Sequence, residues 1–414
     1  MHHLDGIFRI HPEWHPQNRS DRFPSVEERV KLYMSNWYAP PCQGLGRFQY
    51  QLLHDDGWPR LNVSRPFDPA HSEIFDSIVK PDHWFLLDRR TMKNCARKQW
   101  KHVLWGKQLS SRVLNRRNMR PYCSDVIDLL DITNQLETNT LNASAPLLAY
   151  FGDGSGLGIS LPFFAKYRSS ATKDSLQAVT GECDTNARAP LQTVQHSDKL
   201  KPIIWKLESS RHLQPLKRAR KEDTPWERKL NRAFWAGDMT GPSFGETDFE
   251  KCRSNQRCRF VLDNAHSSLI DCGLTAHRLG SNVVNGTNIK RNRATMSFIQ
   301  KHKVIISLEG NDVASGLKWS LQSESVVLMP PATKTSWVME ELLEPWVHYI
   351  PMHPNGSNAE KMIKWVFTHE QEARRIAERA TLFIYDLLYH PDAMRDERQV
   401  KEEIVRRYQD FWRK

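Results

Sequence analysis

Short runs of mostly apolar residues recur through the second half of the chain. They are followed by Gly, Pro or Glu and lie at 232–236, 304–308, 325–329 and 347–350. Unbroken apolar runs of this length are typical of strands that are buried on both faces, as in a parallel sheet. We therefore predict a strand at each of these places.

Helical spacing of apolar residues takes over toward the C-terminus. It predicts helices over 360–367, 370–390 and 397–412. A further helix is expected to begin near Ala314, after the strand at 304–308. The alternation of strands and helices indicates an α/β fold with a parallel sheet covered on both faces.

The first half of the chain carries fewer regular patterns. Ser25 and Glu28 form a capping box ahead of apolar residues at helical spacing, which predicts a helix. Short strands are predicted at 84–87, 146–151 and 203–205, and the rest of residues 1–60 is expected to be irregular. The basic stretch 217–225 shows no apolar periodicity, so we predict a domain linker or surface loop there.

Composition and charge limit the class of protein more than its function. With 39% hydrophobic and 26% charged residues in 414, the chain is globular and long enough for two domains. Its net charge of +11 is compatible with an anionic partner such as nucleic acid, a membrane surface or a phosphorylated small molecule. A basic surface that only contacts solvent would explain the charge equally well. No apolar run reaches the length of a membrane span. The first residues lack an apolar signal core, so we expect a cytosolic protein or a targeting segment outside this sequence.

The cysteines give no metal or disulfide pattern. Seven cysteines at irregular spacing do not make a disulfide framework. Cys252, Cys258, Cys272 and His277 lack the spacing of common zinc modules, so no metal site is predicted. Glycosylation sequons are weak signs of a secretory lumen; they begin at Asn18, Asn62, Asn142, Asn285 and Asn355.

The segment 309–319 is the first of three loops suited to ligand binding, because ligands of parallel sheets bind outside the carboxyl ends of the strands. Gly310 permits a tight turn, and small residues stand at the start of the predicted helix. Free N–H groups and the helix dipole favour an anion such as a diphosphate there, with Lys318 adding charge. The same residues fit an ordinary capped helix equally well.

The other two loops are weaker candidates. Gly237 and Gly241 bracket a turn that suits a phosphate or ribose, although most such segments only turn the chain. Asp153 stands among glycines after an apolar run, so an acceptor could reach it as a general base. Taken alone, Asp153 fits a turn residue that bonds its own backbone better.

These loops together resemble glycosyltransferase family 90. That family includes capsule-associated xylosyltransferases, Rumi-type protein O-glucosyltransferases and lipopolysaccharide-modifying transferases. The resemblance covers roughly residues 145–385 and is most specific from 303 to 352. The segments that carry it are 309–319, 325–328, 344–351 and 376–380, with 211–216 and 231–241 resembling the lipopolysaccharide-type branch.

The resemblance implies a GT-B-like fold, with two Rossmann-like domains facing across a cleft and a helical C-terminus. Residues 1–224 are expected to form the acceptor-side domain with an irregular N-terminal extension, and 225–385 the nucleotide-sugar donor-binding domain. The helix within 386–414 is expected to pack back on the first domain. The implied donor is a UDP-sugar carrying glucose or xylose, transferred with inversion.

Carried over position by position, the resemblance makes Asp153 the catalytic aspartate. The donor-binding positions are Gly237, Thr240, Gly241, Glu309, Gly310, Asn311, Ala314, Ser315, Gly316 and Lys318. The chain departs from the family at Ala236 and Leu317, where many and several members, respectively, carry Arg. Both departures bear on donor affinity and on the identity of the sugar.

The expected reaction is a single displacement in which Asp153 accepts the proton of the acceptor hydroxyl. No Asp-x-Asp triplet occurs in the chain, which favours phosphate handling without a metal, and no cofactor beyond the donor is expected. The expected partners are the donor and a glycan or protein acceptor, with no nucleic acid, and a membrane tether could lie outside this sequence. Two alternatives stay open: a nucleic-acid-binding protein, and an inactive family member that binds a nucleotide sugar without turnover.

Overall fold

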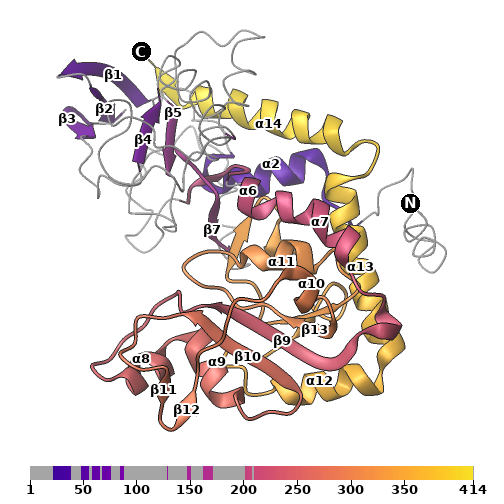
Figure 1. The fold of residues 1–414 in the computed structure, drawn as a ribbon. Coiled ribbons are helices and arrows are strands. Elements are labelled where there is room, and N and C mark those ends of the chain that lie inside the picture. Colours follow the sequence, from indigo (N-terminus) through magenta and orange to yellow (C-terminus); the bar gives the residue numbers. More distant parts are fainter. Residues whose placement is uncertain are drawn as a thin grey trace, which may run out of the picture. The chain divides into compact units, whose positions relative to one another are not determined.

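The computed structural model describes residues 22–38, 48–55, 58–65, 68–75, 84–87, 128, 147–150, 162–170, 201–207 and 209–413. The chain divides into two compact units (Figure 1). One comprises Met1–Phe23 and Ser210–Met394, and the other Pro24–Ser209 and Arg395–Lys414.

A five-stranded parallel sheet forms the centre of the first unit. Its strands, in spatial order, are β10 (Ile270–Ala276), β9 (Leu230–Asp238), β13 (His302–Ile306), β14 (Val326–Met329) and β16 (Ile350–Pro351). The strands predicted at 232–236, 304–308 and 325–329 and the parallel α/β arrangement are thus confirmed for this part of the chain. The strand predicted at 347–350 was wrong in its bounds, because 346–348 form a turn and β16 begins only at Ile350. The strand before Gly237 is longer than predicted, because pairing with β10 continues to Asp238.

Both faces of this sheet are covered, which explains the unbroken apolar runs. The side chains of Trp235, Ile306 and Leu328 belong to a core shared with α9 (Gln256–Asn264), α12 (Ala359–Thr368) and α13 (Glu370–Leu388). On the opposite face, Phe234 packs against Phe298 of α10 (Met296–Ile299), with ring centroids 5.5 Å apart. Alternate residues of one strand therefore serve two layers of helices.

Residues 217–225, predicted as a linker or loop, instead lie mostly within a helix, α7 (Gln214–Glu222). Leu216 and Ala219 are completely buried in it, and α7 packs beside α11 (Ser315–Ser320). Two apolar residues three positions apart are enough to anchor one face of a short helix, but they are too few for a periodic signal. That prediction was wrong for this reason.

Several elements between the predicted strands were not anticipated. Helix α8 (Asp248–Ser254) begins at a capping box formed by Thr247 and Glu250, and α9 follows after a single residue, Asn255. A hairpin of β11 (Val283–Val284) and β12 (Thr287–Asn288) follows β10. Its turn residues Asn285 and Gly286 both have positive φ, which is the usual Asn-Gly hairpin turn.

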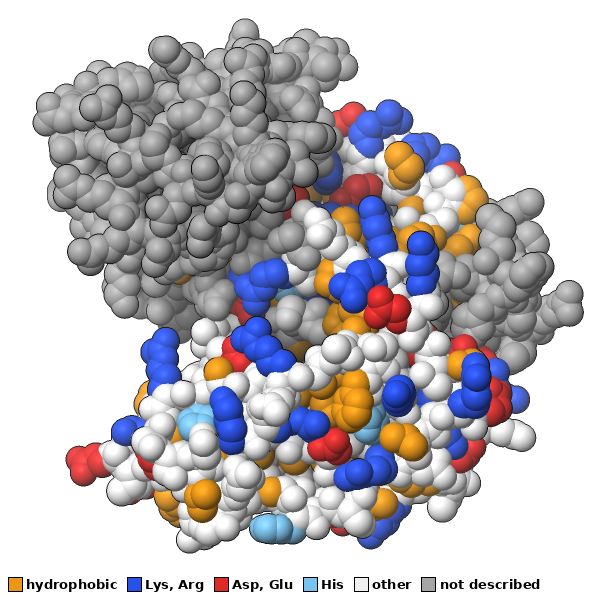
Figure 2. Space-filling view, in the orientation of Figure 1, with side chains coloured by type: hydrophobic (Ala, Val, Ile, Leu, Met, Phe, Trp, Pro, Cys, Tyr) orange, Lys and Arg blue, Asp and Glu red, His pale blue; other side chains and the backbone are white. Residues whose placement is uncertain are grey.

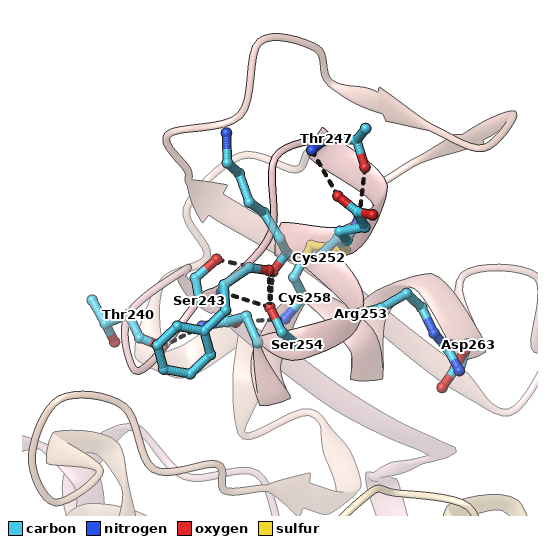
Figure 3. Close-up of a disulfide and its surroundings, with 12 residues drawn as sticks. Thr240, Ser243, Thr247, Cys252, Arg253, Ser254, Cys258 and Asp263 are labelled. Atoms are coloured by element: carbon cyan, nitrogen blue, oxygen red, sulfur yellow. Dashed lines mark hydrogen bonds and ion pairs between the residues drawn. A yellow bond between two sulfur atoms is a disulfide. The ribbon is translucent and has the colours of Figure 1, made fainter.

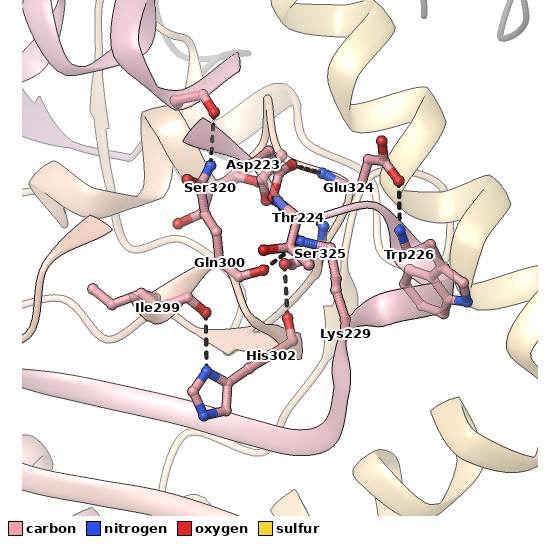
Figure 4. A network of polar contacts seen from close by, with 12 residues as sticks. Asp223, Thr224, Trp226, Lys229, Ile299, Gln300, His302, Ser320, Glu324 and Ser325 are labelled. Carbon is pink, nitrogen blue, oxygen red and sulfur yellow. Dashed lines mark hydrogen bonds and ion pairs between the residues drawn. The ribbon is translucent and has the colours of Figure 1, made fainter. Parts of the chain in front are cut away.

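A polar network closes the amino end of the sheet (Figure 4). Lys229, whose side chain is fully buried, donates to Asp223 Oδ1 and to the carbonyl of Gln300, both at 2.6 Å. Asp223 Oδ2 accepts from the N–H of Glu324 at 2.6 Å, and Glu324 accepts from the N–H of Trp226 at 2.7 Å. The segments that lead into β9, β13 and β14 are therefore tied together by one buried ion pair.

In the residues of the second unit that the structure describes, two small sheets and the helices α2 and α14 are present. One sheet has the order β17 (Trp412–Arg413), β1 (Phe48–Asp55), β2 (Trp58–Arg65), β3 (Asp68–Phe75). The other has the order β4 (Trp84–Leu87), β5 (Leu147–Tyr150), β6 (Phe164–Ala165), β8 (Ile203–Ile204). The short strand β7 (Tyr167–Ser169) lies in the same unit.

The predicted helix after Ser25 is α2 (Val26–Met34), with both hydrogen bonds of its capping box present. Helix α14 (Ala393–Asp410) packs within the same unit: Tyr408 contacts Phe164, and Glu397 pairs with the buried Arg29. The boundaries 1–224, 225–385 and 386–414 stay a prediction. Across the described residues, no helix is both long and apolar enough to cross a membrane.

Candidate functional site

A pocket of about 150 Å³ lies at the carboxyl end of the five-stranded sheet. Its walls come from the loops that follow β9, β13, β14 and β16, which contribute residues within 240–242, 307–317 and 329–334 together with Pro354. Asn255, Gln256 and Glu340 complete the lining. The pocket therefore sits where ligands of open parallel sheets bind.

Strand order explains why a hollow forms at this point. From β9 the chain crosses to β10 on one side and then to β13 on the other side of β9. The loops after β9 and β13 consequently leave the sheet in opposite directions, which is the topological switch point of such folds. Thr240 and Gly241 lie on one of these loops, and Glu309 and Gly310 on the other.

The two loops are joined by direct hydrogen bonds. The N–H of Gly241 donates to Asn311 Oδ1 at 2.8 Å. Gly241 has a φ of 98°, a conformation that favours glycine. The predicted grouping of Thr240, Gly241, Glu309, Gly310 and Asn311 is therefore present in the structure.

Position 310 requires a glycine because neighbouring atoms leave no room for a Cβ. Its backbone conformation does not require one, since its φ is not positive. A Cβ at this position would overlap Thr240 Oγ1 and would lie 2.9 Å from the guanidinium of Arg257. The expectation of a glycine-dependent turn is corrected in this respect: the glycine lets two loops and an arginine meet at one point.

Arg257, from α9, is the main link between the two loops. Its Nη1 donates to the carbonyl of Asp238 at 3.0 Å and to Thr240 Oγ1 at 2.7 Å. Its Nε and Nη2 donate to the carbonyls of Glu309 and Leu308, at 3.0 and 2.8 Å. Burial lowers the pKa of Arg257, against the opposing effect of nearby carboxylates, first that of Asp312.

Asn255 fixes the first loop from the same corner. Its Nδ2 donates to the carbonyls of Thr240 and Pro242 at 3.1 and 3.0 Å, and its Oδ1 accepts from the N–H of Cys258 at 3.0 Å. A disulfide joins Cys252 to Cys258 across this corner (Figure 3). The expectation of no disulfide was wrong here, and among the described cysteines only Cys272 is free.

Glu309 is engaged at the pocket wall rather than available as a free carboxylate. Its Oε1 accepts from the backbone N–H groups of Thr333 and Lys334, at 2.9 and 3.1 Å. Lys334 Nζ lies 3.4 Å from Glu309 Oε2 and 3.2 Å from the carbonyl of Gly310. The carboxylate thus joins the loop after β14 to the loop after β13.

Lys318 does not reach the pocket. Its ammonium group is completely buried and donates to Glu340 Oε1 at 3.0 Å, while Glu340 also accepts from Ser336. Burial acts to raise the pKa of Glu340, but Lys318 and Ser336 outweigh it and the pKa is lowered. The lysine is therefore paired with a carboxylate, and the geometry gives no support to a direct phosphate contact.

The remaining predicted residues fall in three places. Ala314 occupies the N-cap position of α11 and lines the pocket, as does Leu317. Ser315 and Gly316 are the first residues of that helix and do not line the pocket. Gly237 is within β9, where a Cβ would lie 3.1 Å from the ring of Trp235. Asp153 lies outside the described residues, so its catalytic role stays a prediction.

Sequence reasoning missed Asn255 and Arg257, which organise the pocket from a neighbouring helix. No local motif predicts the contacts by which they hold the pocket loops, because those partners, in 238–242 and 308–309, are distant in sequence. The sequence did contain a signal for the helix α8 that precedes Asn255 and Arg257. Thr247 and Glu250 form a capping box like that of Ser25 and Glu28, which predicted the helix after Ser25.

Comparison with known proteins agrees with the location of this pocket. The family model described as glycosyl transferase family 90 matches residues 191–394. The chain is 27% identical over 180 residues to O-glucosyltransferase LpsA of Dichelobacter nodosus, covering 43% of this chain and 49% of the relative. It is 30% identical over 157 residues to protein O-glucosyltransferase 2 of Danio rerio, covering 37% and 28%.

The human protein O-glucosyltransferase 3 is 24% identical over 164 residues, covering 39% of this chain and 29% of the relative. The chain thus spans about half the length of LpsA and less than a third of the two animal proteins. The family match contains the whole sheet and every described wall of the pocket. Residues 191–394, which hold this sheet and this pocket, thus match glycosyl transferase family 90, a family of glycosyltransferases.

Proposed function

We propose that this chain transfers glucose or xylose from a UDP-sugar to a hydroxyl group of a glycan or protein, with inversion and without a metal. The observation that carries the proposal is the pocket at the switch point between β9 and β13, which lies inside the family match. The relatives that match this segment include proteins named O-glucosyltransferases.

The size of the pocket favours the diphosphate as the part of the donor that it holds. Pockets that enclose a whole drug-sized ligand measure about 300–1,000 Å³, so a smaller pocket holds only part of a nucleotide sugar. Its walls at 240–242 and 309–314 consist largely of backbone and small side chains. Such walls let phosphate oxygens approach N–H groups closely.

The proposed chemistry is one displacement at the anomeric carbon. Asp153 accepts the proton of the acceptor hydroxyl while that oxygen forms the new bond and the bond to the diphosphate breaks. Negative charge then grows on the diphosphate, where groups already oriented around the pocket stabilise it. We assign this role to Thr240, which lines the pocket, and to the first N–H groups of α11 at Ser315 and Gly316, which follow the lining residue Ala314.

The wider architecture belongs to the same proposal. We propose that the second unit supplies the acceptor side and Asp153, as in a GT-B-like enzyme with two Rossmann-like domains. We propose a class of acceptor and no single molecule, because the relatives include both a protein O-glucosyltransferase and O-glucosyltransferase LpsA.

The nucleic-acid alternative draws on the net charge of +11. On the face seen in Figure 2, Lys and Arg side chains of the described surface are interspersed with acidic and apolar ones. That distribution favours a solvated basic surface over a continuous nucleic-acid-binding surface on this face.

The second alternative is an inactive family member, which would bind the donor without turning it over.

The test is a donor-turnover assay with UDP-glucose and UDP-xylose on the wild type and on Asp153→Asn. Loss of the general base is expected to lower the rate by about 10²–10⁴, with the dissociation constant for UDP unchanged. Wild-type turnover that Asp153→Asn retains would remove Asp153 from its role. Donor binding without any turnover by the wild type would favour the inactive alternative.

We also propose an oxidising compartment for the folded chain. A buried disulfide and a sequon on an exposed hairpin turn, at Asn285, support this proposal. Expression through a eukaryotic secretory route should give a protein whose mass falls on treatment with an N-glycosidase. An unmodified Asn285 together with free Cys252 and Cys258 would contradict the proposal.

A further inference from the structure

We propose that the corner at which α8 meets α9 carries a clamp that positions the donor pocket. Asn255 and Arg257 are its positioning residues, and the Cys252–Cys258 disulfide is its brace. The proposal rests on the proposed function, because the loops that the clamp holds are those assigned to the donor. The clamp thus consists of Cys252, Asn255, Arg257 and Cys258.

Asn255 can fix the first loop because it is itself fixed. It is 1% exposed, it stands between the two helices, and its Oδ1 caps α9 through the N–H of Cys258. This leaves its Nδ2 aimed at three successive carbonyls, those of Thr240, Gly241 and Pro242, at 3.1, 3.4 and 3.0 Å. One side chain thereby sets the path of the loop after β9.

Arg257 joins that loop to the second one. Its planar guanidinium spans carbonyl oxygens at the ends of both β9 and β13, and reaches Thr240 as well. A lysine could keep the charge but has no fork with which to hold several fixed acceptors at once. The separation of the two pocket walls is therefore set by the shape of one side chain.

The disulfide holds the corner from which both residues project. Cys252 lies in α8 and Cys258 in the first turn of α9, and both side chains are fully buried. Since Asn255 and Arg257 both lie inside the ring that the disulfide closes, the ring limits how far the two helices can separate. Neither sulfur lines the pocket, so the disulfide can act on the donor only through the clamp.

If Asn255 and Arg257 position the pocket loops, their loss has consequences that differ from a general loss of stability. Binding groups held in place before the ligand arrives lower the cost of binding and of reaching the transition state. Loosening the clamp should therefore free the pocket loops while the rest of the sheet stays protected, and it should weaken donor binding in molecules that remain folded.

Hydrogen exchange followed by mass spectrometry tests the clamp without any ligand. Asn255→Asp is the sharpest variant, because it keeps an oxygen to cap α9 and removes the Nδ2 donor. We expect exchange in peptides covering 239–242 to become at least about tenfold faster, with the peptide covering β13 unchanged. Arg257→Gln should extend the effect to 308–310, and Arg257→Lys should fall between Arg257→Gln and the wild type.

Arg253→Gln is the matched control, since Arg253 lies in the same corner but pairs with Asp263 away from the pocket. It should leave both loops as in the wild type. The double substitution Cys252→Ala and Cys258→Ala should speed exchange at 239–242 although it changes no residue of the pocket. Loops that exchange at wild-type rates in Asn255→Asp and Arg257→Gln would overturn the clamp, and unchanged loops in the cysteine variant would remove the disulfide from it.

The dissociation constant for UDP separates failure of the clamp from failure of the proposed function. If both hold, Asn255→Asp and Arg257→Gln should raise it at least about tenfold, roughly the loss of one oriented contact. Arg253→Gln should leave it unchanged. If the wild type binds no UDP, the proposed function fails, while the exchange rates still decide whether the clamp exists.

Discussion

The two ends of the five-stranded sheet use cationic side chains in opposite ways. At the amino end, Lys229 is matched by the carboxylate of Asp223, and the polar groups around it close the structure. At the carboxyl end, the hydrogen bonds of Arg257 go to three carbonyls and one hydroxyl, all on loops that surround a pocket. One cation secures a fold, and the other sets the separation of two loops.

This difference follows from what each end must do. Loops leaving the carboxyl ends of β9 and β13 diverge and leave room for a ligand, so their backbone needs partners from elsewhere. Segments approaching the amino ends need only to be joined. Substitutions at the amino end should therefore change stability, and those at the carboxyl end should change donor binding.

The largest effect is expected from Lys229→Ala. Removing one partner of a buried ion pair leaves Asp223 uncompensated and should cost about 3–5 kcal/mol of unfolding free energy. The dissociation constant for UDP of the folded protein should not change. Urea unfolding and calorimetric titration measure the two quantities, with Arg218→Ala as control, because the exposed pair of Arg218 with Glu222 is worth under about 0.5 kcal/mol.

Acidification should produce the next largest effect, through His348 just before β16. Burial, assisted by the charges of Arg379 and Arg22, lowers the pKa of His348 from 6.5 to about 4. Between these values the unfolded chain binds the proton and the folded chain does not, so stability is lost as the pH falls from 6.5 toward 4. The loss amounts to at most about 3 kcal/mol.

Thermal unfolding measured between pH 7 and 4.5 checks this prediction. His348→Gln should be less stable at neutral pH and should show a shallower slope over that range. An equal slope in wild type and variant would mean that other groups cause the acid sensitivity.

The smallest effect is expected from Thr240→Val at the carboxyl end. The substitution removes one of four acceptors of Arg257 and keeps the shape of the side chain. We expect a loss of about 1 kcal/mol in UDP binding, or roughly fivefold in the dissociation constant. Thr368→Val, on the exposed end of α12, should have no effect on binding. A change in stability alone would contradict the contrast between the two ends.

Periodicity was sufficient to predict the parallel sheet, because β14 and residues 304–306 of β13 are buried and apolar throughout. It failed for α7, whose anchoring depends on only Leu216 and Ala219. The grouping of Thr240, Gly241 and Gly310 followed from the rule that ligands bind at carboxyl ends of strands. A pattern in one segment can therefore locate a site when the fold class is known.

The partners within the site could not be predicted in the same way. Lys318 and Glu340 are 22 positions apart, and only the folded chain shows that they neutralise each other. The pairing of Cys252 with Cys258 likewise depends on how α8 and α9 meet at Asn255. Contacts between distant segments require tertiary structure, and these contacts decide which charges are left for a ligand.

The most direct test of the central claim is calorimetric titration of the wild type and Gly310→Ala with UDP-glucose in the presence of EDTA. Gly280→Ala is the control, since a Cβ there meets only Asp248, at 3.4 Å. We predict that the wild type and Gly280→Ala bind equally, and that Gly310→Ala loses at least about tenfold in affinity because its Cβ forces the two loops apart. Equal binding by all three proteins, or binding by none, would contradict a donor site at the carboxyl end of this sheet.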